Sequence, residues 1–218
     1  MKIGIAASTT FEIAPALKLL ERRQHTIGSN SFDIVITGVG SMASTYELAK
    51  YIFVKKPDYM IQAGICGSFT HEFSRGEVVL IEDEVMGDLG VEENYEFHDI
   101  FDLGLLENGK TPFTLNRLSN PYLHEFNRFN LRQARGITVN EITTRPERIK
   151  LLIDKYNCDT ESMEGAAFHY TCLQATLPFL QLRAVSNEIG ERDKRNWSLQ
   201  EAIKNLNQKL IEIIEQIA

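Results

Sequence analysis

Short apolar runs alternate along the chain with longer segments in which apolar residues recur every three or four positions. Six runs are typical of buried strands: residues 2–7, 32–38, 58–64, 77–85, 134–140 and 179–186. Helical periodicity covers residues 12–23, 42–55, 146–156, 162–174 and 199–217. This alternation predicts an α/β fold of three layers, αβα, around a central, twisted mixed sheet that is mostly parallel.

Length and charge narrow the class of protein. The 218 residues are expected to form one domain, 1–218, and 43% of them are hydrophobic, as in ordinary globular proteins. A net charge of −7 argues against a nucleic-acid partner, which requires a concentrated positive field. The chain begins without the features of a signal peptide, and no run approaches the roughly 20 apolar residues of a membrane span. We therefore expect a cytoplasmic protein without a membrane partner.

The cysteines do not form a recognisable metal or disulfide pattern. Cys66, Cys158 and Cys172 are widely spaced and lack a CxxC motif or a neighbouring histidine cluster. They are expected to be reduced, partly buried thiols, and the protein is expected to need no metal and no organic cofactor.

The predicted sheet ranks the loops in which ligands would bind. In parallel sheets ligands lie beyond the carboxyl ends of strands, here residues 7–11, 38–41, 64–69 and 186–193. Residues 87–130 are less regular and read as a long excursion, which predicts a lid or a contact surface. Gly38, Gly40 and Ala43 match the GxGxxA fingerprint of dinucleotide-binding proteins. They follow the second strand instead of the first, however, and the candidate acid, Asp58, precedes a strand instead of ending one. Close packing of a turn and a helix is the favoured interpretation.

Three polar residues near these loops suit cleavage of a purine N-glycosidic bond, which needs a base for water, a grip on the sugar and a donor for the leaving base. Glu12 follows the first loop and Glu164 begins a helix, so each is either a favourable helix-start charge or a functional acid. Asn187 ends an apolar strand, where an amide caps a turn or binds a base. An amide can donate to O6 and accept from protonated N7 of a 6-oxopurine, whereas a carboxylate suits the amino group of adenine.

Four segments carry a resemblance over nearly the whole chain: GVGSMAS, PDYMIQAGICGSF, ESMEGAAF and LPFLQLRAVSN. They resemble the purine nucleoside phosphorylase and nucleosidase superfamily, which implies a nucleoside phosphorylase-like fold and a nucleoside substrate. By this resemblance Glu12 activates water, Asn187 contacts the base, and Met163 and Glu164 bind the ribose. Cys66 and Gly67 match the glycine-rich loop near the sugar. The resemblance also implies a homodimer or higher homo-oligomer. No purine-stacking residue can be assigned within residues 138–145.

The resemblance separates hydrolysis from phosphorolysis. Related phosphorylases place an arginine before the glycine loop, where this chain has Gln62 and Ala63, and the first loop has no cation between Lys2 and Lys18. Water is therefore the expected nucleophile.

Within the hydrolytic branch, the methylthioadenosine/S-adenosylhomocysteine nucleosidases ordinarily have aspartate at the position of Asn187. The asparagine, together with GDLGVE and SNEIGERDKRNW, resembles the futalosine hydrolases of menaquinone biosynthesis, which release hypoxanthine. Release of adenine from methylthioadenosine or aminodeoxyfutalosine, and binding of a purine nucleoside without turnover, are the alternatives. Candidates to contact a benzoate-bearing substrate extension are Arg192, Arg195, Trp197, Phe97 and His98, although ERDKR is usually a solvated loop.

Overall fold

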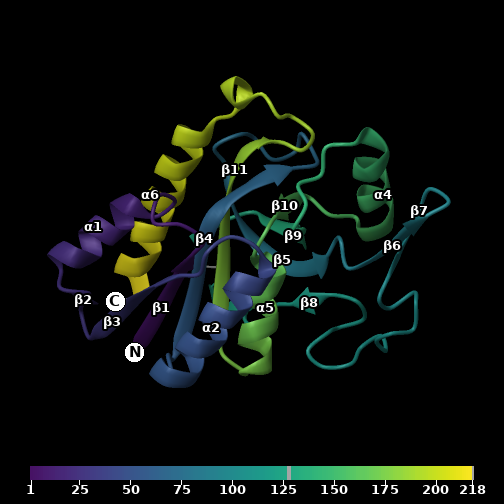
Figure 1. Ribbon diagram of the computed structural model, residues 1–218. Helices are drawn as coiled ribbons and strands as arrows, with labels where there is room; N and C mark the ends of the chain where they lie inside the picture. Colours follow the sequence, from purple (N-terminus) through teal and green to yellow (C-terminus); the bar gives the residue numbers. More distant parts are fainter. Residues whose placement is uncertain (127–128, 218) are drawn as a thin grey trace.

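The computed structural model describes residues 1–126 and 129–217. Within these residues nine strands form one mixed sheet with helices on both faces, which confirms the expected three-layer α/β fold (Figure 1). In chain order the elements are β1 (Lys2–Ala7), α1 (Ala14–Arg22), β2 (Thr26–Ile27), β3 (Asn30–Ile36), α2 (Ser41–Lys55), β4 (Tyr59–Ser68), β5 (Val78–Met86), β6 (Gly90–Glu93), β7 (Glu96–Asp99), β8 (Leu118–Ser119), α3 (Leu123–Phe126), β9 (Gln133–Thr138), α4 (Pro146–Tyr156), β10 (Thr160–Ser162), α5 (Gly165–Gln174), β11 (Phe179–Glu188), the 3-10 helix η2 (Lys194–Asn196) and α6 (Leu199–Ile217).

The sheet brings the ends of three strands together. Its order is β10-β9-β5-β11-β4-β1-β3-β2, and β8 pairs with β5. Strands β3, β1, β4 and β11 are parallel to one another, whereas β11 and β5 are antiparallel. Strand β10 pairs with β9 on one side and with β4 on the other. The carboxyl ends of β1, β4 and β11 therefore lie at the same edge, beside β10.

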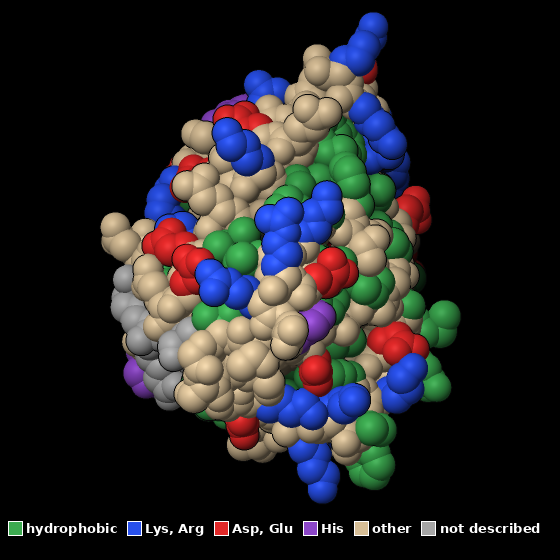
Figure 2. Space-filling view, turned by 90° about the vertical axis from the view of Figure 1, so that its left-hand side faces the viewer, with side chains coloured by type: hydrophobic (Ala, Val, Ile, Leu, Met, Phe, Trp, Pro, Cys, Tyr) green, Lys and Arg blue, Asp and Glu red, His purple; other side chains and the backbone are tan. Residues whose placement is uncertain are grey.

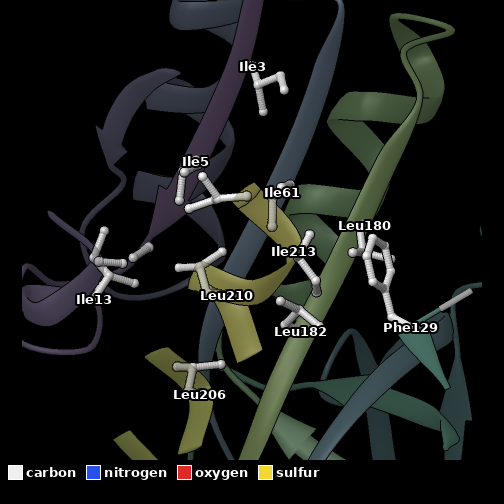
Figure 3. Close-up of a cluster of buried hydrophobic side chains, with 14 of the residues drawn as sticks. Ile3, Ile5, Ile13, Ile61, Phe129, Leu180, Leu182, Leu206, Leu210 and Ile213 are labelled. Carbon is white, nitrogen blue, oxygen red and sulfur yellow. The ribbon is translucent and has the colours of Figure 1, made fainter. Parts of the chain in front are cut away.

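Two hydrophobic layers hold the helices on the sheet. Helices α1 and α6 cover one face, where residues of the strands pack against the apolar stripe of α6; Figure 3 shows Ile5, Ile61 and Leu182 of the strands around Leu210 and Ile213. Helices α2 and α5 cover the other face and pack against each other (Figure 1). Both layers consist mainly of buried side chains, so the sheet is a rigid support for its carboxyl-end loops.

Several predicted boundaries shift at the sheet edge. The helices at 146–156 and 199–217 match the prediction, but β4 and β11 extend to Ser68 and Glu188 because they continue to pair beyond a register shift. Helices α1 and α5 begin later than predicted, at Ala14 and Gly165. The excursion over 87–130 contains the β6–β7 hairpin, β8 and α3, and its residues 127–128 lie outside the described part.

The surface and composition of the fold add three observations. Acidic and basic side chains are mixed over the face that Figure 2 shows. Among the described residues no helix is both long and apolar enough to cross a membrane. The same part of the chain holds no group of three or more His, Cys, Asp or Glu residues placed to bind a metal ion.

Candidate active site

A cavity of about 340 Å³ opens at the shared carboxyl end of β1, β4 and β11. It is lined by the loop after β1, the ends of β4 and β11, and the segment between β10 and α5. All six residues singled out from the sequence line it: Glu12, Cys66, Gly67, Met163, Glu164 and Asn187. The fold thus brings together side chains that are up to 175 positions apart in the chain (187 minus 12). Their chemical roles stay predictions.

Glu12 is held by four hydrogen-bond donors. Its Oε2 accepts from Ser8 Oγ at 2.5 Å, Thr9 N at 3.0 Å and Thr9 Oγ1 at 3.1 Å, and its Oε1 accepts from Ile65 N at 3.2 Å. The residue is buried and lies two positions before α1, so it is not the first-turn helix charge that the sequence allowed. These donors fix the carboxylate with Oε1 beside Gly64, where it can orient a water molecule.

Glu164 immediately precedes α5, but its side chain does not cap that helix. Instead, Oε1 accepts from the backbone N–H of Gly40 at 3.0 Å, and Oε2 lies 3.9 Å from Nη1 of Arg183. Burial raises the pKa of Glu164, and the neighbouring Arg183 guanidinium opposes that shift. A first-turn helix charge is therefore the wrong interpretation here too, and the carboxylate keeps lone pairs free for sugar hydroxyls.

Arg183 is the site residue that the sequence reasoning missed. Its side chain is buried, its Nη2 donates to Gln62 Oε1 at 3.1 Å and its Nη1 donates to Ile65 O at 3.3 Å. A Cβ on Gly64 would overlap Nη1 and lie 3.1 Å from Glu12 Oε1, so glycine is required where the two side chains meet. An arginine in an apolar strand was the available signal, because a buried charge needs partners.

This arginine also bears on the choice of nucleophile. The first loop carries no cation and Gln62 stands where related phosphorylases have an arginine, but Arg183 places a buried positive charge beside Glu164. The guanidinium is not arranged for phosphate, however, because Gln62, the Ile65 carbonyl and Glu164 occupy its sides. A phosphate dianion would also be repelled by the carboxylates of Glu12 and Glu164, which line the same cavity.

Asn187 lies just after a register shift between Val185 and Asn187, which turns the end of β11 toward the cavity. Its Oδ1 lies 2.8 Å from Ser186 Oγ, and its Nδ2 donates to Glu188 O at 2.8 Å. Both contacts come from adjacent residues and fix which end of the amide is oxygen. One N–H and one lone pair remain for a ligand, so the amide can both donate and accept.

The other three predicted residues form walls. Burial raises the pKa of the Cys66 thiol to about 12, so it is a neutral thiol and not a nucleophile. A Cβ on Gly67 would overlap Ile189 and lie 3.4 Å from Asn187 Nδ2, which leaves room for a ligand only with glycine there. Met163 presents an apolar side chain to the cavity, while its carbonyl accepts from Ser41 Oγ at 3.4 Å.

Basic and aromatic residues lie at one end of the cavity. Arg192 and Trp197 line it, as does Lys194, which the sequence reasoning did not single out. The Arg192 guanidinium lies 5.6 Å from the Trp197 ring centre. Arg195 does not line the cavity, because its side chain is exposed and paired with Asp193.

Two of the proposed aromatic contacts lie elsewhere. Phe97 and His98 are on β7 and line other depressions, beside Arg148 and Lys155. The β6–β7 hairpin directs them away from the cavity, so they are not substrate contacts within this chain.

The glycines of the rejected dinucleotide fingerprint have a local role. Gly38 and Gly40 have φ angles of 75° and 89°, which L-residues rarely adopt, and Gly40 precedes α2. The turn brings the Gly40 N–H to Glu164. This agrees with a turn that packs closely, and it adds a hydrogen bond to the site.

Comparison with known proteins identifies the family. The model of the phosphorylase superfamily matches residues 11–217. The chain belongs to this superfamily. It is 30% identical to the futalosine hydrolase of Thermus thermophilus, over 78% of this chain and 75% of that protein. It is 23% identical to a 5'-methylthioadenosine/S-adenosylhomocysteine nucleosidase of Geobacillus, over 100% and 99% of the two chains.

The fold agrees with this membership. The solved structure of the Helicobacter pylori 5'-methylthioadenosine/S-adenosylhomocysteine nucleosidase superposes on this chain with a TM-score of 0.80 at 15% identity. The match covers 99% of this chain and 98% of the Helicobacter pylori chain. The expected superfamily and enzyme class, a nucleosidase that cleaves an N-ribosidic bond, are confirmed by these relatives. Both substrate types occur among them, so the substrate depends on the site residues.

Proposed function

We propose that this protein is a futalosine hydrolase, which cleaves the N-ribosidic bond of futalosine with water and releases hypoxanthine, in menaquinone biosynthesis. The observation that carries this proposal is the oriented amide of Asn187 at the end of β11. Its free N–H suits O6 of a 6-oxopurine, and its free lone pair suits N7 once that atom is protonated. Adenine presents an amino group instead of O6 and is matched better by a carboxylate.

The remaining residues fit the two other requirements of the reaction. Glu164 accepts hydrogen bonds from the ribose diol, and Glu12 orients water for attack at the anomeric carbon as the C–N bond breaks. The positive charge of Arg183, 3.9 Å from Oε2 of Glu164, offsets part of the repulsion between these carboxylates. As the bond breaks, the purine takes the bonding electron pair and N7 takes a proton from solvent, while Glu12 takes the proton that the attacking water loses. Asn187 stabilises the protonated purine.

The basic end of the cavity supports futalosine over smaller nucleosides. Futalosine carries a benzoate-bearing extension in place of the 5' hydroxyl, which needs an apolar wall and a cation. Arg192, Lys194 and Trp197 supply these two features where the cavity reaches η2. Inosine has no group that would contact this end of the cavity.

A substrate panel tests the function. The protein is incubated without phosphate with futalosine, aminodeoxyfutalosine, inosine and methylthioadenosine, and free base is followed by chromatography. Hypoxanthine released from futalosine, with little base from the others, supports the proposal. Adenine from methylthioadenosine, or a strict need for phosphate, overturns it. The alternative, an adenine-releasing nucleosidase, is kept because relatives of that type match the full chain.

We further propose a cytoplasmic homodimer. The outer side of α2 carries exposed apolar side chains at Met42, Tyr46 and Phe53, and the residue just before this helix, Gly40, donates a hydrogen bond to Glu164. Large apolar residues gathered beside a site are typical of a contact surface. Sedimentation velocity of the protein and of Phe53→Lys measures the association; a monomeric unaltered protein would contradict it.

A further inference from the structure

A further carboxyl group lies beneath the site, outside the cavity. Glu84 of β5 is 1% exposed and does not line the cavity. A Cβ on Gly165 would overlap Oε1 of Glu84, so this carboxyl group lies against the backbone at the start of α5. Gly165 directly follows Glu164, and Glu84 therefore supports the segment that carries the ribose-binding acid.

Side chains from two further strands hold the Glu84 carboxyl group in place. Thr138 Oγ1 of β9 donates to Glu84 Oε2 at 2.9 Å and accepts from the N–H of Ala166 in α5 at 2.7 Å. Nε2 of Gln181, on β11, lies 2.9 Å from Oε1 of Glu84. The first N–H groups of α5 have no acceptors inside the helix. Thr138 supplies an acceptor for one of them, the N–H of Ala166.

His169 of α5 continues the network and defines its protons. The ring is fully buried, and its Nδ1 lies 2.8 Å from the Leu118 carbonyl oxygen. A carbonyl can only accept, so Nδ1 carries the proton. Burial lowers the pKa of His169 to about 4, and the neutral ring therefore presents Nε2 as a bare acceptor.

Two acceptors are then left facing each other. Within the described part of the chain, Nε2 of His169 and Oε1 of Gln181 are both buried and have no hydrogen-bond partner, yet the Gln181 side chain is close enough to hydrogen-bond with His169. A buried acceptor without a donor costs about 1–3 kcal/mol. A half turn of the amide exchanges its oxygen and nitrogen, which places Nε2 toward His169 and Oε1 toward Glu84. The contact between Gln181 and Glu84 then joins two oxygens and requires a proton.

We propose that Glu84 is a neutral acid that positions the ribose-binding Glu164, an inference that rests on the function proposed above: Glu84 donates its proton to Oε1 of Gln181, and Gln181 donates from Nε2 to His169. One proton thereby satisfies both buried acceptors. The alternative, a His169 imidazolium and a Glu84 carboxylate joined through the Gln181 amide, holds the same number of protons. It is disfavoured because it buries two charges.

The surrounding charges agree with a neutral Glu84. Burial raises the pKa of Glu84 to about 7; hydrogen bonds from Gln181 and Thr138 and the charge of Arg183 oppose the shift, and Asp83 adds to it. The titratable or charged groups that act on Glu84 are Arg183 on β11, Asp83 on β5 and, through Gln181, His169 on α5. With Glu84 neutral, Arg183 is not shared with a third anion and its charge serves Glu164.

Stability as a function of pH tests the inference without any substrate. The folded state keeps a proton that the unfolded chain loses at its ordinary pKa of 4.5, so this stabilising contribution is complete below pH 4.5 and is lost as pH rises through about 7. Glu84→Gln mimics the neutral acid and should lack this decline, which is read as the difference in urea midpoint from the wild-type protein because His169, whose pKa is lowered, makes stability rise with pH in both proteins. Glu82→Gln, the same change two positions away at a partly exposed ion pair with Arg135, is the matched control and should keep it.

Two further readouts separate positioning from a merely structural role. Nitrogen-15 NMR should show His169 as the neutral Nδ1–H tautomer from pH 6 to 8. At pH 6, Glu84→Gln should keep kcat and KM within about threefold, whereas Glu84→Ala should raise KM for nucleoside about tenfold, the effect of roughly one lost hydrogen bond. An imidazolium at pH 6, or a wild-type pH slope in Glu84→Gln, overturns the inference. If futalosine is not cleaved, the function fails, while the stability and NMR results still decide the state of Glu84.

Discussion

Nη1 of Arg183 lies 3.9 Å from Oε2 of Glu164, and both side chains are buried. The pair joins β11 to the start of α5. Among the described groups that shift the pKa of Glu164, Arg183 is the one of opposite charge. Because the guanidinium also donates to Gln62 and Ile65, it is fixed in place whether or not a substrate is bound. Glu164, the acid proposed to bind the ribose, thus has its opposite charge supplied by β11.

Replacing this cation should affect both stability and catalysis. Arg183→Met leaves Glu164 buried without its charge partner, which typically costs about 3–5 kcal/mol of unfolding free energy. We also expect kcat/KM to fall at least about 100-fold, because the Glu164 carboxylate is no longer oriented by the arginine. Urea denaturation and steady-state kinetics measure the two effects. Arg22→Met, at an exposed position of α1, is the control, and equal stability of the two variants would contradict the pairing.

Glu12→Gln should separate binding from chemistry. The amide keeps the size of the side chain but cannot take a proton from water, so turnover should fall about 10²- to 10⁴-fold. Ribose and base contacts come from other residues, and nucleoside binding by calorimetry should be nearly unaltered. Glu21→Gln, on the exposed side of α1, should have normal activity. A loss of binding in Glu12→Gln would assign this residue a structural role instead.

The sequence predicted the layers of this fold better than the details of its site. Periodicity located α4 and α6 because their apolar stripes are continuous. Helices α1 and α5 instead begin after Glu12 and Glu164, whose side chains accept tertiary hydrogen bonds from Ile65 and Gly40. Arg183 was missed because a strand pattern shows which residues are apolar but not which buried charge faces another strand. The Glu84–Gln181–His169 network joins positions 97 and 12 residues apart, and no local pattern links them.

Asn187→Asp should change the preferred base. A carboxylate at this position faces O6 of hypoxanthine with like partial charge, so kcat/KM for futalosine should fall about 100-fold or more. Release of adenine from aminodeoxyfutalosine should fall less or rise, because its amino group can donate to the new carboxylate. The ratio of the two kcat/KM values is the measurement. Asn108→Asp adds the same charge on an exposed loop and should leave the ratio unaltered; an unaltered ratio in Asn187→Asp would remove this residue from base recognition.

The basic end of the cavity should act only on the substrate extension. Arg192→Gln removes a cation that lines the cavity, and losing one charge-assisted hydrogen bond of about 1.5 kcal/mol should raise KM for futalosine about tenfold. Inosine has the same base and ribose but no benzoate, so its KM should stay unaltered. Arg195→Gln is the matched control, because Arg195 is three positions away, highly exposed and paired with Asp193 outside the cavity. Equal effects of Arg192→Gln on the two substrates would show that this arginine shapes the cavity generally and does not bind the carboxylate of the extension.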